Sequence, residues 1–337
     1  MLCASQIAAH FKASLSGSDV EVSGLSALKD ATSCDVALCY DGRFLDDLKH
    51  TKAGLVIVSE ARFLKIAPCA AIQVDHPRGC LAYLAEHLCA QPVVTPGIDK
   101  TARVHPTAQI AQGVSIGPYV VVGARVSIGC NVQIASHCVL AEDVEIGAYS
   151  KLDVAVVLHR SVSIGSHCVI GTQSVIGACG FGFERIDDQW QALPHVGSVQ
   201  IDDRVSLGSQ VTIDRGLYAA TWIQSGVKID SKVHIGHNAV IGQRTIVAGC
   251  TGISGSVTIG CDCMIGGGVG IADHVELADG VVLLAGSHVM SSVNQPGTYG
   301  SGLPLQTHRA WAKCLVGFKK LPALMGLLSK KEKVKAT

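Results

Sequence analysis

An aliphatic residue recurs at every sixth position through most of the chain. One series runs from Val104 to Ile176 without a gap, the register returns at Ile201, Leu207 and Ile213, and a second series runs from Ile223 to Val289. A period of six fits neither the 3.6-residue turn of a helix nor the two-residue alternation of a strand. A fixed period over so long a stretch is typical of a repeat fold, in which each repeat packs on its neighbours.

The period predicts a mainly β fold built as a solenoid. Three six-residue strands form one triangular coil of 18 residues, and the aliphatic residue of each strand points inward. The pattern accounts for about nine coils, which at a strand spacing of about 4.8 Å make a prism about 40 Å tall. Each coil hydrogen-bonds only to its neighbours, so the two ends of the stack need caps.

Residues 1–97 do not follow the period and predict a small α/β domain. Ser5 is a candidate N-cap of a short first helix. The apolar runs at residues 54–58 and 70–74 predict buried strands, and residues 78–89 predict an amphipathic helix. The proline-containing stretch at residues 91–97 suits a linker.

The repeat domain is predicted over residues 98–295, followed by a C-terminal helical extension over residues 296–337. We expect a helix from Gln306 to about Lys335, interrupted near Pro322. Its end is basic, with Lys319, Lys320, Lys330, Lys331, Lys333 and Lys335. Two interpretations stay open for this end: a solvated terminus, or a docking surface for an acidic partner.

Two segments break the six-residue register and must leave the prism as loops. Residues 177–200 include Phe181, Phe183 and Trp190, and a shorter break covers residues 214–222. Loops of this kind often carry binding function. The alternative is that they only cover a neighbouring subunit.

Composition excludes several classes of protein. Basic and acidic side chains number 27 each, so no overall field favours a nucleic-acid partner. Cys138, Cys168 and Cys263 follow an inward aliphatic residue by four positions, and we interpret them as reduced, buried side chains. Because we find neither a signal peptide nor a membrane span in the sequence, we expect a cytoplasmic protein with at most peripheral membrane contact.

Two histidines are predicted to point outward on the same side of the prism. His237 is two residues past inward Ile235, and His274 is three past inward Ile271, nearly two coils higher and roughly 10 Å along the axis. Imidazole is the side chain best suited to accept a proton near neutral pH. Asp230 is a candidate to orient this base, and the Gly255 N–H is a candidate to bind an oxyanion. The alternative for each histidine is a plain surface position.

Other chemistries have weaker support. A catalytic zinc site needs three convergent imidazoles and an open position. His234 and His237 are three residues apart, but one is on the flat of a strand and the other at a corner, so we expect no metal. We find no constellation for a nucleophilic serine or cysteine, and no phosphate-binding glycine loop. A smooth prism offers no deep pocket, so we expect sites between the subunits of a symmetric oligomer.

The sequence resembles the UDP-3-O-acylglucosamine N-acyltransferases of lipid A biosynthesis over nearly its whole length. The resemblance lies in Gly180-Phe-Gly-Phe183, Thr212-Ile-Asp-Arg-Gly216, the Ile235 to Gly242 stretch, Cys263-Met-Ile-Gly-Gly267 and Ser301-Gly-Leu-Pro-Leu-Gln306. It implies a left-handed β-helix with an N-terminal α/β domain, and a homotrimer. It also implies transfer of a 3-hydroxyacyl chain from acyl carrier protein to the glucosamine 2-amine of a UDP-3-O-acyl sugar.

The resemblance also implies roles for single residues. His237 matches the general base, His274 a histidine that contacts the sugar nucleotide, and Gly255 the position whose N–H faces the thioester oxygen. Asp230 and Asn238 fall on further substrate-site positions. No separate cofactor is implied, because the donor acyl group arrives on the 4'-phosphopantetheine of acyl carrier protein.

The N-terminal domain departs from the family pattern. Leu38, Asp41 and Phe44 stand where the family commonly has Phe, Asn and Tyr, at positions similar to those that hold uracil and ribose. Tyr40 is a candidate to replace the missing ring, so Tyr40, Asp41 and Phe44 are predicted to bind the nucleotide. The departures raise an alternative, a diverged transferase that acts on another nucleotide amino sugar. A third hypothesis is a non-catalytic prism that serves as a rigid spacer.

The resemblance implies two further departures in the repeat domain. His234 and His288 replace residues that are more usually Gln and Met near the paths of the carrier arm and the acyl chain.

Overall fold

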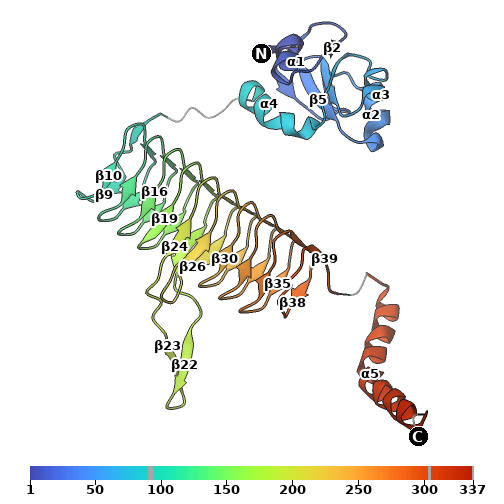
Figure 1. The fold of residues 1–337 in the computed structure, drawn as a ribbon. Helices are drawn as coiled ribbons and strands as arrows, with labels where there is room; N and C mark the ends of the chain where they lie inside the picture. The colour runs from blue at the N-terminus through green and yellow to red at the C-terminus, as the bar shows by residue number, and fades with distance from the viewer. Residues whose placement is uncertain (90–94, 303–304, 336–337) are drawn as a thin grey trace. The chain divides into compact units, whose positions relative to one another are not determined.

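The computed structural model describes residues 1–89, 95–302 and 305–335 (Figure 1). The chain divides into two compact units, Met1–Val93 and Val94–Thr337. Most of the predicted linker, at residues 91–94, lies outside the described residues.

The N-terminal unit is a small α/β domain around a five-stranded sheet. The strand order is β2 (Leu15–Ser16), β7 (Ala70–Gln73), β6 (Leu55–Val58), β5 (Asp35–Cys39) and β4 (Gly24–Leu25), and a separate pair joins β1 (Leu2–Cys3) to β3 (Glu21–Val22). All four residues of β6 are buried, as expected of a continuous apolar run in the middle of a sheet. The predicted strands at residues 54–58 and 70–74 are therefore β6 and β7.

The helices of this unit are α1 (Ala4–His10), α2 (Leu45–His50), α3 (Ala61–Leu64) and α4 (Leu81–Leu88). The prediction that Ser5 caps the first helix was wrong. Cys3 is the N-cap, and its backbone N–H is held by the Gln6 side chain, whereas the Ser5 hydroxyl donates to Asp19. The predicted helix at residues 78–89 starts with a 3-10 turn at Pro77–Cys80 before α4.

The repeat unit is a left-handed parallel β-helix with three faces, as predicted (Figure 1). The first face has eleven strands, from β8 (Gly97–Ile98) to β39 (Gly297–Tyr299), and the second has ten, from β9 (Arg103–Val104) to β38 (His288–Val289). The third has nine, from β10 (Gln109–Ile110) to β36 (Glu276–Leu277). Each strand pairs in parallel with one a coil away, so the 18-residue coil is confirmed. Sheets of nine to eleven strands also agree with the expected number of coils.

The strands between these ends are two to four residues long. The first face continues with β11 (Ser115–Ile116), β14 (Gln133–Ile134), β17 (Lys151–Leu152), β20 (Val169–Ile170), β25 (Ser206–Leu207), β28 (Lys228–Ile229), β31 (Ile246–Val247), β34 (Met264–Ile265) and β37 (Val281–Leu283). The second contains β12 (Val121–Val122), β15 (Val139–Leu140), β18 (Val157–Leu158), β21 (Val175–Ala178), β26 (Thr212–Asp214), β29 (His234–Ile235), β32 (Gly252–Ile253) and β35 (Gly270–Ile271). The third contains β13 (Ser127–Ile128), β16 (Glu145–Ile146), β19 (Val162–Ile164), β24 (Val199–Ile201), β27 (Thr221–Ile223), β30 (Val240–Ile241) and β33 (Thr258–Ile259).

The interior of the prism is a stack of aliphatic side chains. From Ile116 to Val289 the six-residue positions are buried, and the position four residues later is buried with them. Cys138, Cys168 and Cys263 occupy this second inward position and have no exposed surface, as predicted. Burial raises the pKa of the Cys138 thiol to about 11, so the thiol stays neutral in the stack.

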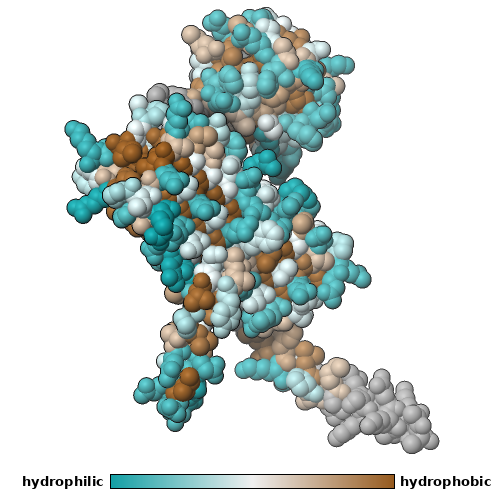
Figure 2. Space-filling view, turned by 60° about the vertical axis from the view of Figure 1, so that its left-hand side comes forward, coloured by the Kyte–Doolittle hydropathy of each residue, from teal (hydrophilic) through white to brown (hydrophobic). Residues whose placement is uncertain are grey.

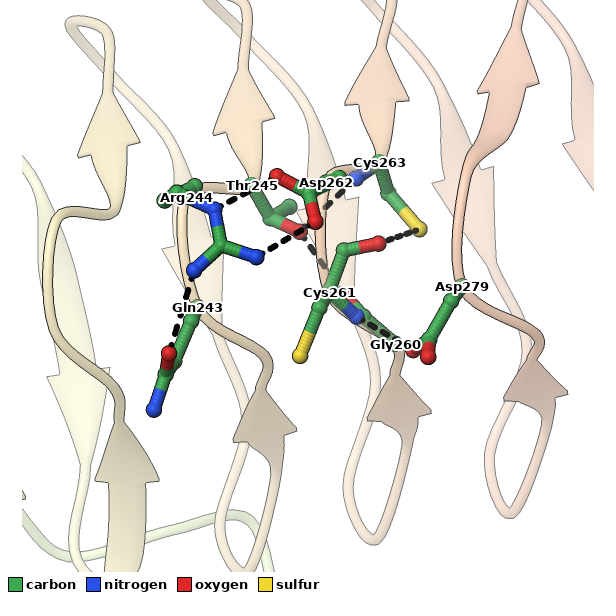
Figure 3. A network of polar contacts seen from close by, with 8 residues as sticks. All are labelled: Gln243, Arg244, Thr245, Gly260, Cys261, Asp262, Cys263 and Asp279. Atoms are coloured by element: carbon green, nitrogen blue, oxygen red, sulfur yellow. Dashed lines mark hydrogen bonds and ion pairs between the residues drawn. The ribbon is translucent and has the colours of Figure 1, made fainter.

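The corners of the prism have a regular geometry that the period did not reveal. The residue three positions after an inward aliphatic usually adopts a left-handed backbone, as at Tyr119 (φ 59°) and His274 (φ 56°). Such corners stack one coil apart, so their side chains meet. Arg244 donates two hydrogen bonds to Asp262, 18 residues on, at 2.7 and 2.6 Å (Figure 3). On the same corner the buried Thr245 hydroxyl donates to the Gly260 carbonyl.

The first break in the register leaves the prism as predicted, whereas the second is shorter than predicted, with only residues 215–220 between β26 and β27. The first forms a hairpin of β22 (Phe183–Ile186) and β23 (Gln189–Ala192) that projects from the coils (Figure 1). Arg215, at the start of the second break, is buried, and its guanidinium donates to the carbonyls of Gly177 and Arg160 at 2.8 Å each. This side chain therefore ties the base of the hairpin to the coil below.

The C-terminal extension is a single helix, α5 (His308–Lys335), after a described loop that includes Gly302. The predicted interruption at Pro322 was wrong, since the proline lies inside the helix. The side chains of Lys330, Lys331, Lys333 and Lys335 lie outside the part that the structure describes. Within the described residues, no helix is long and apolar enough to cross a membrane.

Candidate active site

A cavity of about 680 Å³ lies on the second face of the prism and its corner with the third face, in the coils after the hairpin. It is lined by residues from successive coils of this face: Asp214, His234, Gly236, His237, Gly252, Ile253, Ser254, Gly255, Gly270, Ile271, Ala272, Asp273, His274, His288 and Met290, with Phe181 from the base of the hairpin. The predicted residues His237, Gly255 and His274 therefore meet in one cavity.

The floor of the cavity is hollow because two outward positions lack side chains. The outward residues of β29, β32, β35 and β38 are His234, Gly252, Gly270 and His288, stacked in register. A methyl group at Gly252 would meet no atom within 4 Å, so open space lies above it. The hollow is therefore bounded by His234 at one end and His288 at the other.

His237 is half-buried, and its ring is oriented by its neighbour. His237 Nδ1 lies 3.1 Å from Asn238 Oδ1, and the same oxygen accepts the backbone N–H of Leu217 at 2.8 Å. Because that N–H can only donate, it assigns the amide oxygen to this position, and His237 Nδ1–H must be the second donor. The neutral ring then keeps an unprotonated Nε2, which is the form that a general base requires.

Gly255 lies directly against the free edge of the His237 ring. A Cβ at Gly255 would lie 2.6 Å from His237 Nε2, so any side chain here would displace the ring. Among the described residues, none accepts a hydrogen bond from the Gly255 N–H. A free donor beside an imidazole acceptor matches the geometry of oxyanion stabilisation.

His274 belongs to the corner above this pair. It is exposed, lines the same cavity, and its backbone N–H donates to the Gly255 carbonyl at 3.1 Å. The hydrogen bond couples the position of Gly255 to the next coil. The outward direction predicted for both histidines is thus the direction seen.

The expectation that Asp230 orients His237 needs correction. Asp230 follows β28 of the first face, whereas His237 follows β29 of the second, so the two lie at different corners of the prism. The Asp230 carboxylate accepts the backbone N–H groups of Ser231 and Gly249 at 2.7 and 3.1 Å. Within one chain the orienting group is Asn238.

Two residues near His237 could not be identified from the six-residue period. Asp214 is 9% exposed and lines the cavity, with its Oδ2 3.7 Å from His234 Nε2. Burial raises the pKa of this carboxyl, against the opposite effect of His234, His237 and His195. His195 is buried, and its ring meets that of His237 edge to face at 5.1 Å. Both residues lie at register breaks, where the period no longer predicts direction.

Metal binding has no further support from the geometry. Among the residues that the structure describes, no group of three or more His, Cys, Asp or Glu side chains is arranged to hold a metal ion.

The N-terminal unit has a cavity of its own, of about 500 Å³. Leu38, Tyr40 and Phe44 line it, and the rings of Tyr40 and Phe44 meet edge to face at 5.2 Å. The Arg78 guanidinium lies 5.4 Å from the centre of the Tyr40 ring. Asp41 is not among the residues that line this cavity. Arg43 binds its carboxylate and lowers its pKa. Two of the three predicted nucleotide-binding residues are thus brought together.

Comparisons with known proteins agree with this architecture. A model of the UDP-3-O-(3-hydroxymyristoyl) glucosamine N-acyltransferase family matches residues 19–87, and a model of the GMPPB C-terminal domain matches residues 98–179. A UDP-3-O-acylglucosamine N-acyltransferase of Methylobacillus flagellatus is 37% identical over 316 residues, which cover 94% of this chain and 90% of the relative. One from Acinetobacter baylyi is 40% identical over 302 residues, covering 89% and 84%.

The fold also has a solved counterpart. The structure of an Arabidopsis UDP-N-acetylglucosamine acyltransferase aligns with a TM-score of 0.56 at 22% identity, over 61% of this chain and 71% of that one. At this identity the likeness is one of fold.

Proposed function

The chain belongs to the UDP-3-O-acylglucosamine N-acyltransferase family, and we propose that it transfers a 3-hydroxyacyl chain from the thioester of acyl carrier protein to the 2-amine of a UDP-3-O-acylglucosamine. The observation that carries the proposal is that the free edge of the His237 ring lies against Gly255, whose N–H donates to no described residue, in one cavity. An amine acyl transfer needs one group to take a proton and one to bind an oxyanion.

In the proposed reaction the amine nitrogen attacks the thioester carbonyl and forms the C–N bond. His237 Nε2 accepts the proton that the amine loses, while Asn238 holds the opposite side of the ring. The carbonyl oxygen becomes an oxyanion and accepts the Gly255 N–H. When the C–S bond breaks, His237 returns the proton to the departing pantetheine thiolate, so neither a metal nor an acyl-enzyme is needed.

The remaining roles follow the shape of the cavity. The hollow over Gly252 and Gly270 is assigned to the acyl chain, with the apolar Phe181 and Met290 at its rim. His274 is assigned to the sugar nucleotide, and Tyr40 and Phe44 to its base. We also propose a homotrimer, because Val121 and Val139 leave the second face exposed and apolar in its N-terminal coils. Figure 2 shows a broad apolar area on this end of the prism.

Mass analysis of the product tests the proposal. Purified protein is incubated with acyl carrier protein carrying mixed 3-hydroxyacyl chains and with UDP-3-O-acylglucosamine. The expected product is heavier by one 3-hydroxyacyl group in amide linkage. Absence of turnover with every thioester donor would support the non-catalytic spacer instead.

One observation favours the second candidate, a transferase for another nucleotide amino sugar. Asp41 is bound to Arg43 rather than facing the N-terminal cavity, and Leu38 supplies an aliphatic wall. Parallel assays with other UDP-amino sugars decide between the two. A kcat/KM higher for one of these sugars than for UDP-3-O-acylglucosamine would establish the second candidate.

A further inference from the structure

We propose that Asp214 is a positioning residue whose carboxylate offsets the positive charge that forms on His237, and that His234 competes for the same carboxylate. The inference rests on the proposed role of His237 as the base.

The surroundings of Asp214 distinguish it from other carboxylates of the prism. It ends β26, is buried, and accepts no hydrogen bond from an N–H or O–H group of a described residue. Asp230, by contrast, accepts two backbone N–H groups. A buried carboxylate without such donors is costly unless a cation compensates it. This environment therefore favours a positive charge nearby.

Imidazoles are the groups that can supply this charge. His234 Nε2 lies 3.7 Å from the Asp214 carboxylate, and His237 lines the same cavity as both. The His195 ring, at the base of the hairpin, meets that of His237 at 5.1 Å. Burial raises the pKa of the Asp214 carboxyl, and the three imidazoles oppose that shift. Arg215 is adjacent in sequence, but its guanidinium is bound to two carbonyls elsewhere. Asp273, His274 and His288 also line the cavity. Protonation of one of the three imidazoles thus provides the charge that Asp214 requires.

Two of these imidazoles differ in how they are held. His234 Nδ1 lies 2.8 Å from Thr212 Oγ1, which turns its Nε2 toward Asp214 at 3.7 Å. In the proposed reaction, His237 becomes an imidazolium when it takes the substrate proton. When His234 is protonated it pairs with Asp214 and opposes the charge on His237. When His234 is neutral, it no longer competes, and the Asp214 carboxylate stabilises the positive charge on His237.

The proposal predicts opposite shifts for two substitutions. Asp214→Asn removes a negative charge that favours the imidazolium form of the base, so the low-pH decline of kcat/KM (the acid limb) moves to lower pH by about half a unit. The plateau falls about tenfold, because the imidazolium is less stabilised in the transition state. His234→Gln removes a competing positive charge, so the acid limb moves to higher pH.

The measurement is the pH dependence of kcat/KM for the full-length enzyme from about pH 5.5 to 9, with acyl carrier protein thioester and UDP-3-O-acylglucosamine. Titration of the substrate amine is common to all variants and cancels in the comparison. Asp262→Asn is the matched control, because this carboxylate lies at another corner, bound to Arg244 (Figure 3). Its acid limb should coincide with that of the parent.

An acid limb that stays in place in both Asp214→Asn and His234→Gln would overturn the inference, as would shifts in the same direction. If Asp214→Asn does not fold, as judged by its thermal midpoint, His234→Gln decides alone through the sign of its shift. A parent enzyme without acyl transfer would instead refute the proposed function, and that result appears before any variant is made.

Discussion

The second face of the prism has two unlike halves. In the N-terminal coils its outward residues are Arg103 and then Val121, Val139, Val157 and Val175, whereas after the hairpin they are Thr212, His234, Gly252, Gly270 and His288. The inward residues of the two halves are equally aliphatic and equally buried. The comparison shows that inward positions maintain the fold, while outward positions are free to differ and carry the chemistry.

The boundary between the halves coincides with the two register breaks. There the chain leaves the prism, forms the hairpin and returns with Asp214 and His195 beside the first coil of the functional half. A regular coil repeats the same geometry every 18 residues. Interrupting it lets buried polar groups approach His237 from a direction that no regular coil offers.

The largest effect on kcat is expected from removing the proposed general base, which lies in the half of the prism after the hairpin. His237→Ala should lower kcat about a thousandfold, because general-base catalysis contributes about 10²–10⁴-fold. The thermal midpoint should stay close to that of the parent, since the side chain is half-buried and outside the stack. Steady-state kinetics and calorimetry check both parts, and a variant with near-parental kcat would exclude this role.

A substitution in the aliphatic stack of the N-terminal coils should affect stability rather than chemistry. Ile146→Ala removes a side chain that is 3% exposed and leaves a cavity in the stack. The expected cost is about 3 kcal/mol in the free energy of unfolding. Urea unfolding measures this loss, and kcat of the folded enzyme should be unchanged. A large drop in kcat at a temperature where the variant is folded would contradict the separation of the two halves.

Gly255→Ala tests whether catalysis depends on the close contact between Gly255 and the His237 ring. The added methyl group would overlap His237 Nε2, so the ring must shift, and kcat should fall roughly a hundredfold. Gly252→Ala is the control from the same face, since its methyl group meets no atom within 4 Å and should disturb the ring far less. Equal losses of kcat in the two variants would show that any methyl group added on this face lowers activity. The contact between Gly255 and the His237 ring would then not be the cause.

The smallest effect concerns a thiol in the stack. The folded pKa of Cys138 is about 11 against an ordinary value of 9.0, so its stabilising contribution is complete below pH 9 and declines as pH rises toward 11. The difference in unfolding free energy between the parent and Cys138→Ala should shrink over this range. Urea titrations at several pH values measure it. Cys250→Ala, at an exposed corner, should show no such trend.

The six-residue period predicted every feature that the repeat makes uniform. In a coil of fixed length each position has one direction, so the period alone predicted the buried cysteines and the outward aim of His237 and His274. The same logic explains why Gly255 was found, one coil above His237. Local capping was less predictable, because Ser5 lost the N-cap to Cys3 through a distant contact with Asp19.

The groups that surround the base could be identified only from the folded chain. Asp230 and His237 are seven residues apart, but a triangular coil turns a corner within that distance and separates them, which leaves Asn238 to orient the ring. Asp214 and His195 reach the site through insertions that follow no period. In a regular repeat the position of a residue in the sequence fixes the direction of its side chain. Which residues come close together across an interrupted coil depends on where the chain re-enters the prism.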